Sequence, residues 1–235
     1  MLPIAKAEFI QMLRDPLVLF MATVIPLGIS VFLYWNRDTI GGTPVIASLV
    51  MAVIPSFVVY ASTTTTLASR RQNLFLKRMR STSLSDPAIL LGLSLVLIVL
   101  SAAQTLVILM VLTLVDSGPS SPVHVVAVLL LTHAMFFGLA LATAGITSSP
   151  DSAQITVLPI TMGVVGVATW VAATGTDEMA GLKLSLPGGA AAELIVQAWS
   201  EDATGEMTML LIPTLAWVGL AFLAARFLFQ WEPRR

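Results

Sequence analysis

Apolar residues in this chain are gathered into six long runs, which short polar segments separate. An α-helix needs about 20 mostly apolar residues to cross the hydrocarbon core of a bilayer, and each run approaches or exceeds that length. We therefore predict six membrane-spanning helices, at residues 17–34, 44–67, 88–115, 123–146, 153–173 and 207–229. Because backbone groups in lipid must bond within the protein, the pattern predicts an all-α integral membrane protein, with one domain over residues 1–235.

Five of the six runs begin close to a polar residue that is followed by proline. The side chain of such a residue can accept a hydrogen bond from an N–H of the first helical turn, and a proline at the first helical position has no N–H to leave unpaired. We expect the first residue of each pair to cap the following helix, at Asp15-Pro16, Thr43-Pro44, Asp86-Pro87, Ser121-Pro122 and Ser149-Pro150.

The composition agrees with a membrane protein, since 57% of the residues are hydrophobic and 11% are charged, against about 25% charged residues in soluble domains. The Lys and Arg residues also segregate along the chain. If the N-terminus lies in the cytoplasm, ten of the twelve fall in inner segments, and only Arg37 and Lys183 fall in outer ones. Under the positive-inside rule, this distribution predicts that both termini are cytoplasmic.

The segment 1–15 is too short to span and has an amphipathic helical pattern. Its apolar residues share one helical face, at Leu2, Ala5, Phe9, Met12 and Leu13, and Gln11 and Arg14 lie opposite. We expect this helix to lie in the inner interface of the membrane, in contact with lipid. It is either a simple anchor or an element with a further role.

The strongest concentration of positive charge lies between the second and third runs. Five of the twelve Lys and Arg residues fall within residues 70–80. A helix here would place Gln72, Phe75, Leu76 and Met79 on one side and Arg70, Arg71, Lys77 and Arg78 on the other, with Leu74 among them. The charge alone would serve topology and attraction to anionic lipid. Exposed Phe75 and Met79 favour docking to another protein.

The segment 174–206, between the fifth and sixth runs, contains an apolar piece that is too short to span. It extends from Leu186 to Trp199 and begins with Pro187, Gly188 and Gly189, which suit a turn. We expect a re-entrant or interfacial element on the outer side. The alternative is an ordinary loop that rests on lipid.

No recognisable catalytic chemistry is present. The dipeptide Gly-Lys does not occur, so there is no Walker A loop, and there is no cysteine and no His-Glu-x-x-His motif. No predicted span has Asp or Glu in its middle, which disfavours a proton-driven pump. The net charge of −1 gives no sign of nucleic-acid binding. We expect a chain that is not an enzyme and that holds no metal or cofactor itself.

Two polar side chains in the middle of predicted spans, Gln104 and His133, need hydrogen-bond partners in lipid. They either bond to a neighbouring helix or contact a transported substrate, and both alternatives stay open. Prolines, each of which removes a helical hydrogen bond and permits a kink, lie inside four spans, at Pro26, Pro55, Pro159 and Pro213.

Three stretches of the sequence resemble a known family. Residues 76–92 (LKRMRSTSLSDPAILLG) combine a basic helix, a turn of small residues and the start of a span. Residues 7–16 (AEFIQMLRDP) form a helix with Glu, Arg and Pro, and residues 148–154 (SSPDSAQ) form a short inner turn. These features are similar to those of ABC-2 type exporter membrane subunits, close to the daunorubicin and multidrug-resistance permease group.

The resemblance implies a division of labour. A separate cytoplasmic ATPase, in two copies, would bind ATP and Mg²⁺, and a second permease, the same or a related chain, would complete the transporter in a bacterial plasma membrane. The segment 1–15 would be the connecting helix, in which the relevant residues are Glu8, Phe9, Met12 and Arg14. The segment 70–82 would be the coupling helix, which docks on the ATPase through Arg70, Arg71, Leu74, Phe75, Leu76, Lys77, Arg78, Met79 and Arg80.

In that arrangement the second and fifth spans of both permeases flank the transport pathway. The residues that would line it are Ser56, Phe57, Tyr60, Met162 and Thr169, with Gln104 and His133 as further candidates. The implied function is ATP-driven outward transport of an amphipathic drug, antibiotic or lipid-like molecule. A permease for a lipid-linked glycan, a secondary transporter and a membrane scaffold without an ATPase partner are the alternatives.

Overall fold

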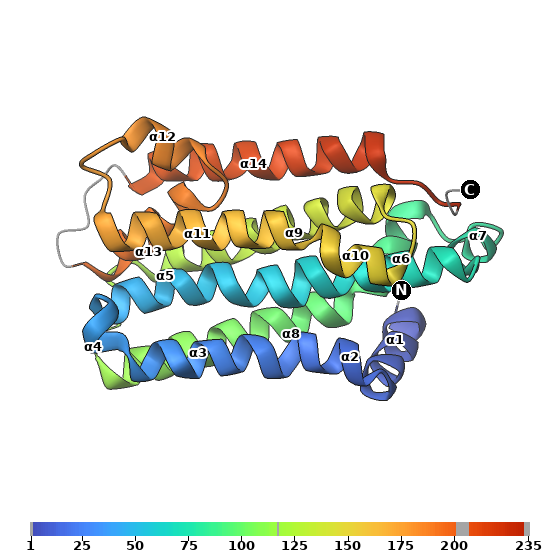
Figure 1. Ribbon diagram of the computed structural model, residues 1–235, viewed down its shortest axis with the longest axis horizontal. Coiled ribbons are helices and arrows are strands. Elements are labelled where there is room, and N and C mark those ends of the chain that lie inside the picture. The colour runs from blue at the N-terminus through green and yellow to red at the C-terminus, as the bar shows by residue number, and fades with distance from the viewer. Residues whose placement is uncertain (1, 117, 201–206, 233–235) are drawn as a thin grey trace.

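The computed structural model describes residues 2–116, 118–200 and 207–232, which form helices and turns without a strand. The long helices lie side by side along one axis and form one bundle (Figure 1). Six helical segments are long and apolar enough to span a membrane, at Pro16–Trp35, Gly42–Gln72, Asp86–Val115, Pro122–Ile146, Pro150–Thr174 and Met207–Leu228. The prediction of an all-α fold with six spans is confirmed.

The first two spans each contain a π-helical turn between two α-helical parts. The first span consists of α2 (Pro16–Leu19), η1 (Phe20–Val24) and α3 (Ile25–Trp35), and the second of α5 (Gly42–Pro55), η2 (Ser56–Ala61) and α6 (Ser62–Gln72). The two π-helical turns contact each other. Pro55 lies directly before η2, and Pro26 lies two residues after η1. Because a proline cannot supply the N–H of the regular α-helical ladder, it favours an irregular turn nearby.

The other spans are closer to regular α-helices. The third is α8 (Asp86–Val115), the fourth is α9 (Pro122–Ile146), and the sixth is α14 (Met207–Leu228). The fifth consists of α10 (Pro150–Thr156) and α11 (Leu158–Thr174), with the break close to Pro159. Five shorter helices connect or precede the spans, namely α1 (Leu2–Arg14), α4 (Arg37–Ile40), α7 (Phe75–Met79), α12 (Ala180–Ser185) and α13 (Gly189–Trp199).

The second span forms the centre of the bundle. Of its most apolar stretch, 94% is buried, against 18% for the first span and 22% for the sixth. The outer faces of the surrounding spans expose large apolar side chains, among them Phe32, Leu114, Ile155 and Phe227. Exposed apolar surface of this kind is stable in lipid rather than in water, because lipid chains are as apolar as these side chains.

Small residues bring α14 and α9 into close contact along their length. A Cβ atom added to Gly138 would lie 2.9 Å from the Cβ of Ala221, and one added to Gly145 would lie 2.1 Å from the carbonyl oxygen of Leu228. Neither position therefore has room for a side chain. Glycine and alanine at such contacts let two membrane helices approach backbone to backbone.

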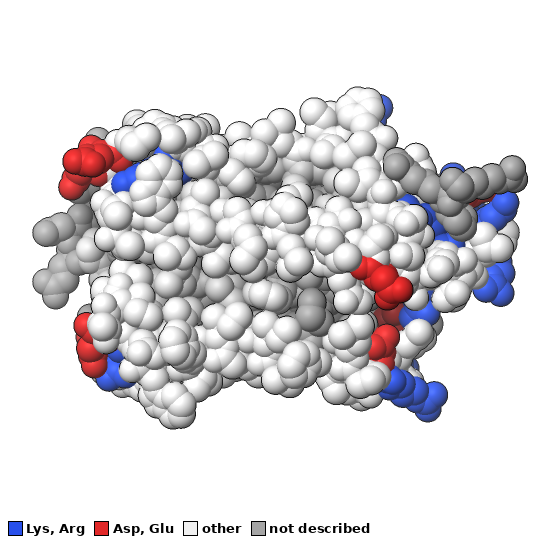
Figure 2. Space-filling model, viewed as in Figure 1, with Lys and Arg blue, Asp and Glu red and all other residues white. Residues whose placement is uncertain are grey.

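Charged residues collect at the two ends of the bundle. Figure 2 shows most Lys and Arg residues at the end that carries α1 and α7, where both termini of the chain also lie (Figure 1). We call this the basic end, and the end with α4 and α12 the opposite end. The segregation of charge along the sequence is therefore a segregation in space. Arg234 and Arg235 lie outside the described residues.

The expected helix caps are confirmed at two positions. The carboxylate of Asp15 accepts hydrogen bonds from the N–H groups of Leu17 and Val18, each at 3.1 Å. Ser149 and Ser152 form a reciprocal capping box at the start of α10. In both cases no other partner competes for the capping side chain among the described residues.

The expected side-chain caps are wrong at the other three positions. The helix begins at Gly42, so Thr43 lies inside it rather than before it. Asp86 is in the first turn of α8 and accepts a bond from Arg80 at 3.2 Å. The hydroxyl of Ser121 bonds the ring of His124 at 2.7 Å instead of a backbone N–H. Side-chain partners outside the local backbone explain the last two differences.

Candidate functional site

Helix α1 presents two different faces at the basic end. Glu8 and Met12 are buried against the bundle, whereas Phe9, Leu13 and Arg14 are exposed. On this α-helix Phe9, Met12 and Leu13 share one sector, as predicted, but the bundle covers that sector only at Met12 and leaves Phe9 and Leu13 exposed. Burial of Glu8 beside Met12 turns the remaining apolar residues outward, where a helix at the membrane interface meets lipid.

Arg70, near the end of α6, joins three helices. Its guanidinium lies 2.8 Å from the Glu8 carboxylate, and the two side chains are only 12% and 9% exposed. It also donates a hydrogen bond to the side-chain oxygen of Gln11 and lies over the ring of Phe75, 5.3 Å from the ring centre. Because α1, α6 and α7 all meet at this one side chain, Arg70 holds these three helices together and is not free to bind a partner protein.

Arg71 points in another direction and is buried, with 2% of its surface exposed. It donates hydrogen bonds to the carbonyl oxygens of Gly145, at 3.3 Å, and Thr147. These carbonyls belong to the C-terminal end of α9, where the last carbonyls of a helix lack partners in the helix itself and a positive charge is favourable. Arg71 therefore fixes the second span to the fourth.

The basic segment is not one helix over residues 70–82, so that prediction is wrong. Helix α6 continues to Gln72, and α7 begins only at Phe75 after Leu74, which adopts a left-handed backbone conformation with φ of 56°. The two arginines at 70 and 71 thus end a long span, while α7 is a separate short helix. An amphipathic pattern counted across the break could not show this change of direction.

The exposed part of the predicted coupling segment is the outer surface of α7. Leu76 is fully buried and anchors the helix, and Phe75 and Met79 are half-buried. The remaining side chains of the segment are exposed to solvent, at Leu74, Lys77, Arg78 and Arg80. We call this set of six residues, Leu74, Phe75, Lys77, Arg78, Met79 and Arg80, the α7 surface.

The C-terminal tail after α14 lies against the α7 surface. Lys77 pairs with Glu232 at 3.0 Å, and Arg80 lies 4.9 Å from the ring centre of Trp231. The ring of Trp231 in turn meets that of Phe229 edge to face, with 5.2 Å between the centres. The tail after the sixth span therefore contacts the coupling segment, although Trp231 lies 151 residues after Arg80 in the sequence.

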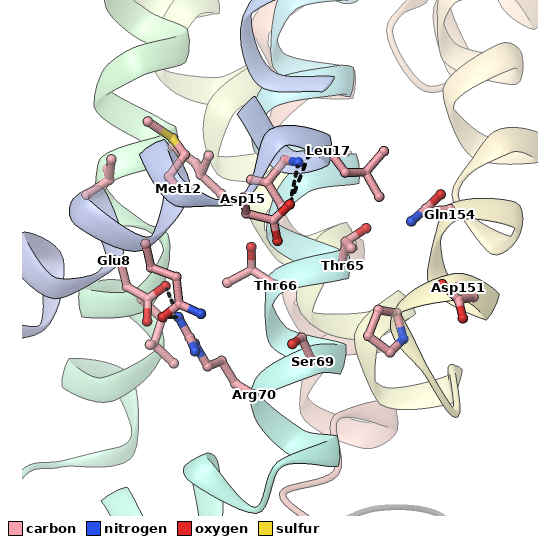
Figure 3. Close-up of a pocket in the computed structure, with 16 residues that line it drawn as sticks. Glu8, Met12, Asp15, Leu17, Thr65, Thr66, Ser69, Arg70, Asp151 and Gln154 are labelled. Carbon is pink, nitrogen blue, oxygen red and sulfur yellow. Dashed lines mark hydrogen bonds and ion pairs between the residues drawn. The ribbon is translucent and has the colours of Figure 1, made fainter. Parts of the chain in front are cut away.

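A polar cavity of about 130 Å³ lies beside the Glu8–Arg70 pair, between α1, α2, α6, α8 and α10. Figure 3 shows its polar side chains, which come from α6 and α10 as well as from α1. Its lining includes Thr65, Thr66, Ser69, Asp151 and Gln154. Nothing in the sequence marked these residues as a site. The hydroxyls could have indicated one, but a single threonine in a membrane helix usually bonds its own backbone.

The cavity offers hydrogen-bonding groups with an acidic bias. The positive charge of Arg70 is paired with Glu8, and the carboxylate of Asp15 is used as a helix cap. Asp151 contributes a further negative charge to the wall. The arrangement can accept a polar or cationic group. Among the described residues no cluster of His, Asp or Glu could hold a metal ion.

The candidate pathway residues fall into two groups. Ser56 and Tyr60, in η2, are fully buried, and the Tyr60 hydroxyl bonds that of Thr143 at 3.0 Å. Phe57 is partly buried. Met162 and Thr169, in α11, are exposed on the outside of the bundle. The structure therefore does not bring these residues together around one open space within a single chain.

Gln104 and His133 make contacts within the bundle. The amide nitrogen of Gln104 donates to the carbonyl oxygen of Ala22, at 3.0 Å. Pro26, four residues after Ala22, has no N–H to offer this carbonyl, so a side chain of the third span replaces the missing bond in the first. His133 bonds the carbonyl of Leu129 in its own helix, at 2.7 Å.

The predicted re-entrant segment contains two helices at the opposite end. Helix α13 is largely buried and packs against α5, α9, α11 and α14, which disagrees with the alternative of a loop resting on lipid. Lys183, with 2% of its surface exposed, donates to Thr174 at 2.8 Å and to the carbonyl of Gly175 at 2.7 Å. Residues 201–206 of this segment lie outside the described part of the chain.

The fold and the arrangement of the basic end define a multi-pass membrane protein with a short helix exposed beside its chain termini. The sequence model of the family described as ABC-2 type transporter matches residues 3–167, from α1 into α11. This match covers more than half of the chain, which therefore belongs to the ABC-2 type transporter family and is a permease component of that transporter type. No curated protein matches the chain in a sequence comparison.

Proposed function

We propose that this chain is the membrane subunit of an exporter. A separate cytoplasmic ATPase, present in two copies, would drive transport. The α7 surface supports this proposal most directly. It combines three exposed cations, Lys77, Arg78 and Arg80, with the apolar side chains of Leu74, Phe75 and Met79. A surface that only set the orientation of the chain in the membrane would need the charges alone. A docking surface also needs apolar contact area.

The proposed orientation places the basic end in the cytoplasm of a bacterium. Among the described residues, eight Lys and Arg residues lie in or next to the span ends on the basic side, and Arg37 and Lys183 lie on the other. This is the distribution that the positive-inside rule associates with cytoplasmic segments. The α7 surface would then face a cytoplasmic partner in the plasma membrane.

We propose that movement of the ATPase reaches the spans through the contacts of α6 and α7. Pressure on α7 would act on Phe75, which lies against Arg70, and through Arg70 on α1 and α6. Arg71 would carry the same displacement to the end of α9. Rigid side-chain contacts of this kind couple two sites only if the bundle has two stable arrangements that both sites favour differently.

A second permease subunit, the same or a related chain, would complete the pathway. The outer face of α11 supports this part of the proposal, because Gly163, Gly166 and Thr169 are exposed there and nothing in the chain lies within 4 Å of a Cβ added to either glycine. Small residues on a membrane helix favour close packing with another helix. The polar cavity would form an inner mouth, where the polar part of an amphipathic cargo binds.

Co-reconstitution of the chain with a candidate ABC ATPase tests this function. We expect an amphipathic substrate to stimulate ATP hydrolysis in lipid discs. In vesicles, the substrate should accumulate on the side of the membrane opposite the ATPase. Replacing Arg78 by Glu together with Phe75 by Ala should reduce both readouts at least tenfold, because the α7 surface loses a charge and an apolar contact. The change Arg37→Glu, at the opposite end, is the matched control and should leave both readouts unchanged.

Two outcomes would contradict the proposal. If the double variant still binds the ATPase and exports normally, the α7 surface is not the coupling element. If the chain transports solute in vesicles that contain no ATPase, it is a secondary transporter, one of the alternatives left open by the sequence.

A further inference from the structure

A second and larger concavity lies on the side of the bundle, away from the polar cavity. It is a groove of about 790 Å³ between α8, α9 and α14. Its walls are apolar over most of their length, and representative side chains are Leu90, Ile98, Leu130, Phe137, Leu141 and Phe222. The function proposed above uses none of these residues.

The packing of the three helices produces this groove. Helix α14 lies close against α9 because Gly138 and Gly145 leave no side chain between them. Helix α8 packs mainly on α1 and on the second span, so it forms a wall on the other side of α9. The floor contains the small side chains of Ala134 and Ala225, which leave the space between the walls unfilled.

The length of the groove corresponds to one leaflet of a membrane. Its floor on α9 extends from Leu130 to Leu141, which at a helical rise of 1.5 Å per residue is about 16 Å. Half of the hydrocarbon core of a bilayer is about 15 Å thick. A single extended acyl chain crosses one leaflet, so its length matches that of the groove.

The two ends of the groove differ in charge. At the basic end it reaches Asp86, Arg226 and Trp231, whereas its inner part is apolar apart from His133. The Nε2 atom of His133 is buried and has no hydrogen-bond partner among the described residues. Asp86 is paired with Arg80 at 3.2 Å. Arg226 is exposed, and it forms no ion pair within the described part of the chain. Within the described residues, a positive charge without an ion-pair partner thus lies where a lipid head group would be.

We propose that the groove binds an acyl chain of an anionic phospholipid from the leaflet at the basic end, with the lipid phosphate on Arg226. The guanidinium can hold a phosphate through two parallel hydrogen bonds, and Trp231 provides the amphipathic ring that is typical of the membrane–water boundary. The bound lipid is a resident ligand at the side of the bundle, not the cargo of the proposed pathway.

Photo-cross-linking in lipid discs tests the site without any ATPase or transport. The probes are phosphatidylglycerol and phosphatidylcholine that carry a photoreactive group at the middle of one acyl chain, each used in otherwise identical discs. We expect phosphatidylglycerol to label peptides of α9 and α14 that line the groove, several times more strongly than phosphatidylcholine does. Equal labelling by both lipids, or labelling spread evenly over all spans, would overturn the proposal.

Two variants with matched controls test the residues. Arg226→Gln should lower the labelling about fivefold, since one basic residue contributes about 1 kcal/mol to binding of anionic lipid, whereas Arg226→Lys should retain most of it. Arg14→Gln removes another exposed charge at the same end and should have no effect on groove peptides. Full labelling of Arg226→Gln would show that the charge does not select the lipid.

The apolar part of the site is tested separately. Ala134→Trp should fill the floor and abolish labelling by both lipids, whereas Ala216→Trp, at an exposed alanine of α14 outside the groove, should leave it unchanged. Unchanged labelling of Ala134→Trp would overturn the proposal. A photoreactive residue placed at position 130 could also cross-link to a second protein chain and not to lipid. That result would overturn the proposal, because it would show that a protein occupies the groove.

Discussion

Single arginines decide how the basic end is assembled. Arg70 and Arg71 are adjacent in the sequence, yet Arg70 bonds Glu8 of α1 and Arg71 bonds the last carbonyls of α9. Both side chains are largely withdrawn from solvent, so their hydrogen bonds and charges are fixed in the folded protein. Removal of one partner from a buried ion pair costs more than the pair contributes, because the other charge stays buried and unpaired.

We therefore predict that Glu8→Gln destabilises the protein by about 3 kcal/mol, the range measured when a buried ion pair loses one member. Arg70→Gln should have a comparable effect, and the double variant should be less destabilised than the sum of the two. Thermal unfolding of the purified protein in detergent measures all three. Additive effects would show that the two side chains do not interact.

The exposed ion pair between Lys77 and Glu232 is the control for this experiment. Its two side chains are 61% and 66% exposed, and exposed pairs contribute less than about 1 kcal/mol. Lys77→Gln should therefore change the unfolding temperature little. A large change would mean that general loss of charge at the basic end, rather than burial, explains the effect of Glu8→Gln.

Only some of these residue contacts could be predicted from the sequence. The caps at Asp15 and Ser149 could be predicted because a cap depends on neighbours in the chain. The pairing of Glu8 with Arg70 could not, since 62 residues separate them and nothing local to either residue indicates the other. For Gln104, a bond to a neighbouring helix and contact with substrate were both open, and the structure has the bond to the carbonyl of Ala22. The reason for this bond, the missing N–H of Pro26, lies in a different helix.

At the scale of helices, apolar runs predicted the spans well and the short helices poorly. Hydrocarbon thickness sets the length of a span, so about 20 apolar residues are sufficient to recognise one. Helix α6 continues five residues beyond the predicted end at Leu67, and in this extension Arg70 and Arg71 bond α1 and α9. The break at Leu74 and the burial of α13 arise from packing against distant segments, which periodicity alone does not contain.

The contact between α9 and α14 makes a specific prediction about Gly145. Gly145→Ala should destabilise the protein by about 1–3 kcal/mol, the usual cost of overpacking, because the new Cβ would lie 2.1 Å from a backbone oxygen of α14. Gly219→Ala, in α14 itself, is the control, since nothing lies within 4 Å of the added atom. Thermal unfolding in detergent compares them, and equal stability of the two variants would contradict the close contact.

For the molecule as a whole, the sequence predicted the number of spans and the segregation of charge, and the family match agrees with the predicted resemblance. The relative positions of the spans were not predictable, because every span is apolar and could pack against several others. In particular, nothing in the sequence identified the second span as the buried centre of the bundle. The pathway residues in η2 and α11 consequently could not be assigned to one surface.

The proposed orientation can be tested directly because the chain has no cysteine. A single cysteine in place of Ser81, exposed at the basic end, should react with a membrane-impermeant maleimide only in inside-out vesicles. A single cysteine in place of Asp177, at the opposite end, should react only in intact cells. The reverse result would invert the orientation and remove the α7 surface from the cytoplasm.

The two arginines at the end of the second span also determine how the bundle can move. They fix one end of a helix of 31 residues, while its other end is surrounded by apolar side chains. In the proposed transporter this end of α6 would act as a fulcrum, and the span would act as a lever about 46 Å long at 1.5 Å per residue. A tilt of about 5° at the fulcrum would sweep the distant end through about 4 Å. In the proposed orientation, a slight rotation beneath the membrane would thus be amplified at the surface where cargo would leave.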